Sequence, residues 1–287
     1  MRHHPAVRPG RVAIVTGAAL GIGRASALAL ARLGMRVVLV DRDEAWLMDA
    51  RDQVAAAAPG GPPDIRAMPV DVADRAAVER LRDATLAAFG EVALLMNNAA
   101  ARGGGGPLDN PDGWRRLIEV NLMGVLHGVQ AFAPVMIAQG TPGAIINTGS
   151  KQGITTPPGD TAYNVSKAGV KVLTEGLAHS LRNTPGCQVS AHLLIPGHTF
   201  VGVAAATGGA KPPGAWSADQ VAAFMLDRLA AGDFYILCPD NEVDRRLDCR
   251  RMQWAIDDII ANRPALSRWH PDYKAAFELF AAQPEPR

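Results

Sequence analysis

The chain has 287 residues, 48% of them hydrophobic and 20% charged, and a formal net charge of +1 at pH 7. This composition is that of a folded globular protein and excludes a disordered or fibrous chain. A charge so near zero gives no electrostatic reason to expect nucleic acid or an acidic membrane surface as a partner.

The N-terminal residues 1–10 are basic and contain proline, and we expect them to form a flexible tail. They lack the apolar core of a secretory leader, and no apolar run in the chain approaches the roughly 20 residues that span a bilayer. The cysteines, Cys187, Cys238 and Cys249, are far apart and odd in number. That pattern favours free thiols over a disulfide or a metal site. We therefore expect a cytoplasmic protein with no metal ion and no membrane partner.

From residue 11 onward, short β-branched runs alternate with Ala-, Leu- and Arg-rich stretches of helical spacing. Such alternation predicts βαβ units and a parallel sheet. The predicted helices lie at 74–89, 111–138, 160–182 and 217–230, and the predicted strands at 12–15, 37–40, 65–70, 92–97, 144–148, 188–195 and 234–237. We expect a doubly wound α/β Rossmann fold over 11–240, with a seven-stranded parallel sheet flanked by helices.

Three Gly- and Pro-rich breaks, at 58–63, 103–107 and 207–214, fall between these elements and are typical of loops. The small side chains around the third break predict a lid over 200–216. After residue 240 the pattern becomes charged and aromatic. This change predicts a helical C-terminal extension over 241–287, packed on the same domain or on a neighbouring subunit.

A glycine-rich segment joins the first strand to an Ala-rich helix, and it contains Gly17, Leu20, Gly21, Ile22 and Gly23. This context is typical of a dinucleotide-phosphate loop. Glycines let backbone N–H groups approach the pyrophosphate at the positive end of the helix. The same glycines could also serve only to turn the chain, so the segment alone is weak evidence.

An acidic residue supports the dinucleotide interpretation. Asp41 closes the second strand, 24 residues after Gly17, near the offset at which a carboxylate binds the adenosine ribose hydroxyls. Asp41 favours NAD over NADP, because it would repel the 2′-phosphate. Arg42 would instead favour NADP if its guanidinium binds the 2′-phosphate. The alternative is that Arg42 is an ordinary surface charge in contact with solvent.

Tyr163 and Lys167 stand four residues apart in a predicted helix, so their side chains project from one face. A phenol, with an ordinary pKa near 10, acts as a base at neutral pH only when a nearby cation favours the phenolate. Such a pair is also frequent by chance on helix surfaces. Whether this pair indicates an active site therefore depends on the residues around it.

With those residues included, the chain resembles a short-chain dehydrogenase/reductase of the shorter type over about residues 11–238. The resemblance rests on 16–23, Asp71, 97–99, Asn121, Ser150, Tyr163, Lys167 and 196–197. It implies an oxidoreductase that moves a hydride between a nicotinamide and a secondary alcohol or ketone of a small molecule, with Tyr163 as the general acid/base. Ser150, 13 residues before Tyr163, would hydrogen-bond the substrate oxygen.

The resemblance also implies the remaining roles. Lys167 would bind the nicotinamide ribose and lower the pKa of Tyr163, while Asn121 would hold a water that relays protons to solvent. Asp71 would accept a hydrogen bond from the adenine amino group, or it caps the next helix. The other implied cofactor contacts are Val72, Asn98, Ala99, Ala100 (where glycine is usual), Pro196, Gly197 and Thr199.

Two other functions share this fold. One is an isomerase or lyase that uses tightly bound NAD transiently, and the other is a non-catalytic dinucleotide-sensing protein. The resemblance further implies a homodimer or homotetramer formed through the helices that contain Asn121 and Tyr163.

Overall fold

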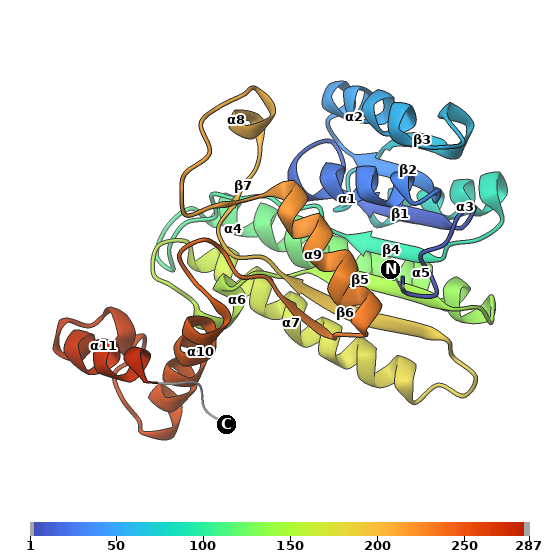
Figure 1. Ribbon diagram of the computed structural model, residues 1–287. Coiled ribbons are helices and arrows are strands. Elements are labelled where there is room, and N and C mark those ends of the chain that lie inside the picture. Colours follow the sequence, from blue (N-terminus) through green and yellow to red (C-terminus); the bar gives the residue numbers. More distant parts are fainter. Residues whose placement is uncertain (1–2, 284–287) are drawn as a thin grey trace.

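The structure, a computed structural model, describes residues 3–283. Seven parallel strands form one central sheet in the order β3-β2-β1-β4-β5-β6-β9 (Figure 1). The strands are β1 (Val12–Thr16), β2 (Arg36–Asp41), β3 (Ile65–Pro69), β4 (Leu94–Asn97), β5 (Gly143–Thr148), β6 (Val189–Ile195) and β9 (Tyr235–Leu237). The strand order reverses between β1 and β4, which is the switch point of a doubly wound Rossmann fold. The predicted fold class is confirmed.

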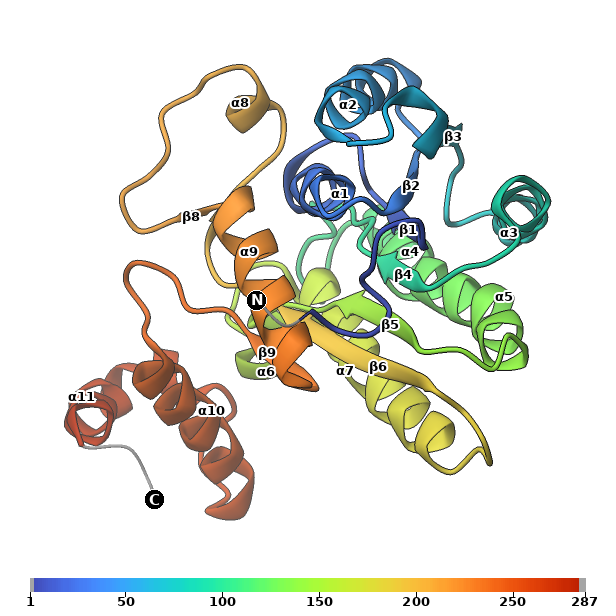
Figure 2. The same ribbon diagram turned by 45° about the vertical axis from the view of Figure 1, so that its right-hand side comes forward.

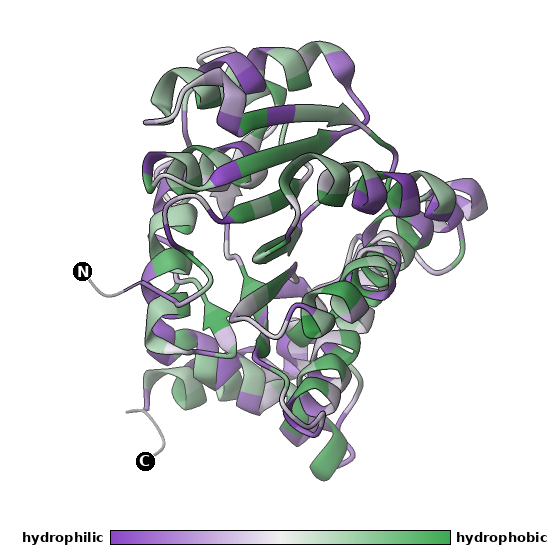
Figure 3. Cartoon of the chain, turned by 90° about the vertical axis from the view of Figure 1, so that its right-hand side faces the viewer, coloured by the Kyte–Doolittle hydropathy of each residue, from purple (hydrophilic) through white to green (hydrophobic). Residues whose placement is uncertain are grey.

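The central strands are largely apolar because both faces of the sheet are covered. Every residue of β1 is buried, and its register pairs Val12 with Arg36 of β2 and Ala13 with Leu94 of β4. Helices α1 (Gly21–Arg32), α2 (Glu44–Ala57) and α9 (Ala218–Ala231) cover one face. Helices α3 (Arg75–Phe89), α5 (Gly124–Ala138) and α7 (Thr161–Arg182) cover the other. Figure 3 shows hydrophobic strands between these two helical layers.

The predicted helix over 111–138 is continuous but not uniform. It consists of α4 (Pro111–Ile118), a π-helical turn η2 (Glu119–Met123) and α5. By length and composition it could cross a membrane, with a mean hydropathy of 1.5 over its apolar window. This corrects the expectation that no stretch reaches that length. However, 56% of the window is buried inside the fold, as in the core helix of a globular protein.

Several short elements were not predicted, because each is held by tertiary contacts rather than by periodicity. They are η1 (Pro62–Asp64), α6 (Gln152–Thr155), β7 (Thr199–Phe200), α8 (Val203–Ala206) and β8 (Trp216–Ser217). The strands β7 and β8 pair with each other, and the loop that carries α8 projects between them beyond the sheet (Figures 1 and 2).

The N-terminal segment, expected to be a flexible tail, is packed where the structure describes it. Ala6 and Val7 are buried in the same hydrophobic cluster as α1 and β2. Their apolar side chains account for the difference, because burying them removes hydrophobic surface from water.

The C-terminal extension comprises α10 (Arg245–Ile260), η3 (Ser267–Trp269), η4 (Pro271–Tyr273) and α11 (Lys274–Ala282). It stands away from the sheet, on the side of α6 (Figure 2). Trp254 forms its centre and packs against Phe277 and Phe280, with ring centroids 5.4 and 5.3 Å away. The indole N–H donates to Ser267 Oγ at 2.8 Å. Trp254 thus packs against α11, and it also lines a pocket between α10 and α7.

Candidate active site

A cleft of about 280 Å³ lies at the carboxyl ends of the strands, where β1 and β4 diverge. A neighbouring pocket extends it past the end of β2. Together these two cavities are lined by all of the predicted cofactor residues except Gly23, and by Ser150, Tyr163 and Lys167. Asn121 does not line either cavity.

The glycine loop has a backbone conformation that only glycine allows at two positions, as a close approach to a dinucleotide requires. Gly17 has φ +64°, and a Cβ there would lie 2.8 Å from Ala99 Cα. A Cβ on Gly23 would collide with the carbonyl oxygen of Gly17. Only glycine therefore allows the loop to lie this close to α1 and β4. The result is a cradle at the N-terminal end of α1, where a pyrophosphate binds favourably.

Asn98 holds this cradle from the side. Its backbone N–H donates to Thr16 Oγ1 at 2.9 Å, and its side-chain Nδ2 donates to the carbonyl oxygen of Thr16 at 3.0 Å. The side chain of Asn98 is thus directed at the glycine loop, although the residue also lines the cleft. Ala100, which stands where glycine is usual, lines both cavities without closing either.

Asp41 lies at the junction of the two cavities. Its carboxylate accepts hydrogen bonds from the backbone N–H of Ala19 at 3.2 Å and of Asp43 at 3.1 Å. Arg42 is largely exposed and stands 4.0 Å from Asp71, in the pocket beyond Asp41. These positions fit an adenosine whose ribose faces Asp41.

The prediction that Asp71 caps the next helix is wrong. The cap of α3 is Asp74, which accepts from the backbone N–H of Ala77 at 3.1 Å. Asp71 instead accepts from the N–H of Ala73 at 3.0 Å and, with Val72, lines the pocket beyond Asp41.

Ser150, Tyr163 and Lys167 meet at the base of the cleft. Asp160 begins α7 by accepting from the backbone N–H of Tyr163 at 3.2 Å. Tyr163 is 9% exposed and Lys167 is 2% exposed, and Lys167 Nζ donates to the carbonyl oxygen of Thr148 at 2.8 Å. The Ser150 side chain is close enough to the Tyr163 hydroxyl to lower its pKa, and Ser150 Oγ also accepts from the backbone N–H of Gln152 at 3.1 Å. The structure thus brings together the three residues that the sequence singled out.

The pKa of Tyr163 is not governed by Lys167, contrary to what the resemblance implied. Burial raises this pKa, and the interactions that oppose the rise come from Arg102 and from the side chain of Ser150. Lys167, the expected cause, lies 5.8 Å from the centre of the Tyr163 ring and is directed at Thr148. Sequence reasoning missed Arg102. The available signal was a cation directly after the 97–101 segment, at the start of a glycine-rich loop.

Burial also lowers the pKa of Lys167 to about 8, with a further contribution from Arg102. Between this value and the ordinary 10.5, the unfolded chain binds a proton that the folded chain releases, so stability from this group rises with pH. At pH 7 the buried charge opposes folding. We expect Lys167→Met to raise the free energy of unfolding near pH 7 by about 1–3 kcal/mol. The gain should shrink as the pH rises from 8 to 10.5, as measured by urea unfolding.

Lys171→Met is a matched control on the same helix, because Lys171 is a partly exposed lysine paired with Glu175. That variant should show little change in stability and no comparable pH dependence. Equal effects of both substitutions at pH 7 and pH 10 would contradict a burial cost at Lys167.

Asn121 is fully buried in the π-helical turn η2. Its side chain accepts from the N–H of Ala101 at 2.6 Å and donates to the carbonyl oxygen of Ala101 and to Ser166 Oγ. The amide of Asn121 therefore fixes the main chain next to Arg102. The water relay implied by the resemblance stays a prediction.

The last predicted contacts lie after β6, where Pro196, Gly197 and Thr199 line the cleft. Thr199 Oγ1 donates to the carbonyl oxygen of Gly197 at 3.1 Å, which leaves its lone pairs free toward the cleft. The proposed bond from Thr199 to the nicotinamide amide stays a prediction.

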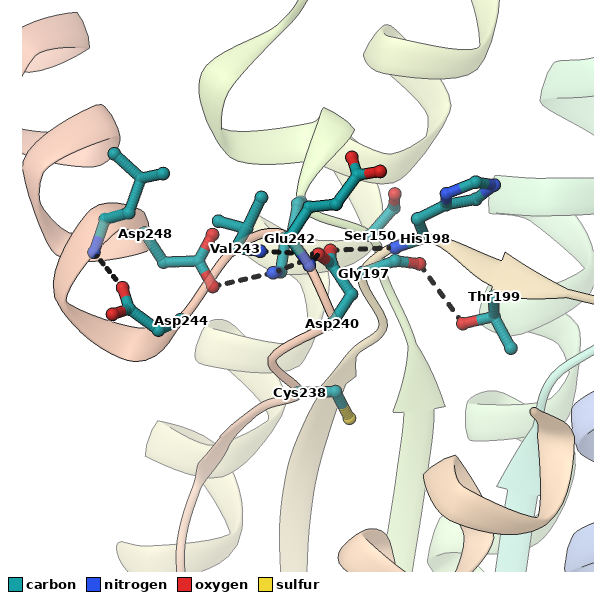
Figure 4. A network of polar contacts seen from close by, with 12 residues as sticks. Ser150, Gly197, His198, Thr199, Cys238, Asp240, Glu242, Val243, Asp244 and Asp248 are labelled. Carbon is teal, nitrogen blue, oxygen red and sulfur yellow. Dashed lines mark hydrogen bonds and ion pairs between the residues drawn. The ribbon is translucent and has the colours of Figure 1, made fainter. Parts of the chain in front are cut away.

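A buried network of ion pairs lies next to Ser150 in the chain. Lys151, the next residue, pairs with Asp240 at 3.3 Å and with Asp248 of α10 at 2.7 Å. Figure 4 shows Asp240 between the loop that holds His198 and the turn at Val243. Its carboxylate accepts from both backbone N–H groups, at 3.1 and 2.8 Å. The C-terminal extension is thereby tied to the segment that carries Ser150.

Burial affects the two carboxylates of this network differently. For Asp240, burial raises the pKa, but the N–H of His198, Lys151 and two further backbone donors outweigh it and lower the pKa. For Asp248, burial prevails over Lys151, and the pKa is raised.

The fold and this cleft define an enzyme built to bind a dinucleotide. The sequence model of the short chain dehydrogenase family matches residues 11–208. The chain therefore belongs to the short-chain dehydrogenase/reductase family, and it is an oxidoreductase. A nicotinamide dinucleotide is the cofactor that the solved relatives support.

Two solved structures illustrate the likeness. A short-chain dehydrogenase/reductase from Burkholderia phymatum, in complex with NAD, is 36% identical, with a TM-score of 0.79 over 90% of this chain and 97% of that chain. A metagenomic short-chain oxidoreductase, in complex with NADP, is 34% identical, with a TM-score of 0.66 over 81% of this chain and 98% of that chain. The two cofactors differ, so they do not decide between NAD and NADP.

Sequence relatives agree on the class of protein. SadH of Mycobacterium tuberculosis, named as an oxidoreductase, is 38% identical over 173 residues, which are 60% of this chain and 61% of SadH. The match thus spans less than two thirds of SadH. An uncharacterized oxidoreductase of Staphylococcus aureus is 32% identical over 68% of this chain and 81% of that protein.

Proposed function

We propose that the protein is an NAD-dependent oxidoreductase that interconverts a secondary alcohol and a ketone of a small molecule. The observation that carries this proposal is the meeting of Ser150, Tyr163 and Lys167 in the cleft beside the glycine cradle. Tyr163 lies beside Ser150 and under the Arg102 cation, both of which oppose the rise that burial causes in its pKa, and its hydroxyl can therefore exchange a proton with a substrate oxygen in the cleft.

The residues divide the work as follows. Bound NAD would accept or supply the hydride, and that is its whole contribution to the chemistry. Ser150 would hold the substrate oxygen, and Tyr163 would take its proton as the alcohol is oxidised or return it as the ketone is reduced. Lys167, buried beside Thr148, would bind the nicotinamide ribose in the same cleft.

The test is a spectrophotometric screen of the purified chain, with NAD and with NADP, against secondary alcohols and ketones. Reduced nicotinamide absorbs in the near ultraviolet, so turnover is read directly. We expect turnover that is faster with NAD. If no member of a broad panel is turned over with either cofactor, the proposal fails, and the alternatives of isomerase, lyase or dinucleotide sensor gain support.

The preference for NAD is assigned to the carboxylate of Asp41. Asp41→Asn keeps the shape of the side chain but removes the charge that would repel a 2′-phosphate. We expect the ratio of kcat/KM with NAD to kcat/KM with NADP to fall about 10- to 100-fold. Asp52→Asn, an exposed position on α2, is the matched control. An unchanged ratio in Asp41→Asn would contradict the assignment.

We also propose a cytoplasmic homodimer or homotetramer. The three cysteines are free thiols, which suits a reducing compartment. Val165 and Val172 are 44% and 65% exposed on α7, the helix that carries Tyr163, and such apolar residues suit a contact between subunits. Light scattering coupled to size-exclusion chromatography would give the oligomeric state.

A further inference from the structure

Beyond the cofactor, the cleft opens into a substrate pocket of about 530 Å³. Ser150 and Tyr163 lie at its base, and the segment 196–202 forms one wall. The charged side chains of this pocket are all basic. They are Arg102 and Lys151, with His198 beside them, and among the described residues that line the pocket there is no aspartate or glutamate.

The two basic residues are not equivalent. Lys151 is already neutralised, because it pairs with the buried carboxylates of Asp240 and Asp248. Arg102 has no such partner. Within residues 3–283 its guanidinium makes no hydrogen bond or ion pair, and it lies 5.5 Å from the centre of the Tyr163 ring. Arg102, which is exposed to solvent, is therefore the cation of the pocket that no carboxylate among the described residues pairs with.

The main chain holds Arg102 in place. Arg116 Nη2 donates to the carbonyl oxygen of Arg102 at 2.8 Å. The preceding residue, Ala101, is held on both its N–H and its carbonyl by the side chain of Asn121. A cation on an anchored backbone next to the reacting tyrosine is arranged to receive an anion, because the cost of ordering the segment is already met.

From this arrangement we propose that the substrate carries a carboxylate, which Arg102 binds while Ser150 and Tyr163 engage its hydroxyl or ketone oxygen. The substrates are then hydroxy acids and the corresponding oxo acids. The inference rests on the proposed function, because it takes Tyr163 as the reacting group. A planar guanidinium matches a carboxylate with two parallel hydrogen bonds. One uncompensated cation also balances one carboxylate charge.

The electrostatics of the site favour the same ligand. Arg102 and Lys167 are both cations beside Tyr163, and Arg102 contributes to lowering the pKa of Lys167. An anion bound at Arg102 would relieve this repulsion. The phosphates of the dinucleotide have their own cradle at α1, so they do not need Arg102, although Arg102 also lines both cofactor cavities.

The kinetic test compares 2-, 3- and 4-hydroxy acids with their methyl esters, in the wild type, Arg102→Gln and Arg102→Lys. We expect the best acid to exceed its ester in kcat/KM by about 30-fold or more in the wild type, and by about twofold or less in Arg102→Gln. The ratio cancels any effect of Arg102 on Tyr163. Arg102→Lys should keep part of the preference. Arg115→Gln, an exposed arginine on α4, should keep all of it.

A binding test is independent of turnover. Titration calorimetry of the complex with NADH would compare butanoate and benzoate with butanamide and benzamide. We expect the carboxylates to bind at least about tenfold more tightly than the amides, and to lose this advantage in Arg102→Gln. No preference in the wild type, or a preference that survives in Arg102→Gln, overturns the proposal.

A third result would reassign Arg102. If Arg102→Gln weakens NADH itself by tenfold or more and leaves the acid-to-ester ratio unchanged, Arg102 binds the cofactor and the carboxylate proposal fails. Failure of the proposed function looks different. In that case no alcohol or ketone is turned over, whereas the preference for carboxylates over amides is still measurable.

Discussion

Tyr163→Phe should reduce kcat by about a thousandfold or more and leave dinucleotide affinity within about twofold. The substitution removes one hydroxyl group and keeps the ring that packs under Arg102. Without the hydroxyl, no group at that position can exchange the substrate proton. The measurements are steady-state turnover of the best substrate and a fluorescence titration with NADH.

Tyr235→Phe is the matched control. Tyr235 is 48% exposed on β9, and its hydroxyl contacts Glu175 rather than the cleft. That variant should retain wild-type turnover. If Tyr163→Phe retains it as well, Tyr163 is not the general acid/base. The proposed chemistry would then have to be abandoned, even though the family assignment would stand.

Much of the fold was accessible from the sequence because its elements are strongly patterned. The helices follow a period of 3.6. The strands are short β-branched runs such as residues 12–15, which a parallel sheet covered on both faces accounts for. The glycine loop, Asp41, Ser150, Tyr163 and Lys167 were accessible for a different reason. Each lies at the end of a strand or on a helix face that the topology directs into the same cleft.

What could not be predicted depends on contacts between distant segments. Arg102 follows a recognisable segment, but only the fold shows that its guanidinium lies over Tyr163. The burial of Ala6 and Val7 depends on a neighbouring strand and helix, and the π-helical turn at Asn121 interrupts a stretch that reads as one regular helix. In the same way, Lys151 reads as an ordinary surface lysine until Asp240 and Asp248 are seen beside it.

Lys151→Met should lower the free energy of unfolding by about 3–5 kcal/mol. The side chains of Lys151, Asp240 and Asp248 are 16%, 5% and 6% exposed, so their charges are poorly screened by solvent. Removing the lysine leaves two buried carboxylates without their shared cation. Asp240 also holds the backbone of His198 and Val243, and therefore the wall of the substrate pocket should loosen. Urea unfolding and the KM of the best substrate report these two effects.

The compensated variant distinguishes charge from packing. Replacing Asp240 and Asp248 with asparagine in the Lys151→Met background removes the two unpaired charges. At position 240 it keeps one acceptor oxygen, for the N–H of Val243, and gives up the oxygen that accepts from the N–H of His198. If the loss comes from uncompensated charge, the triple variant should recover most of the stability lost in Lys151→Met, because a neutral buried cluster has no desolvation penalty of that size. If it is no more stable than Lys151→Met, the lysine acts through the packing of its aliphatic chain. The lysine side chain would then stabilise the contact between α10 and the Ser150 segment by packing rather than by ion pairing.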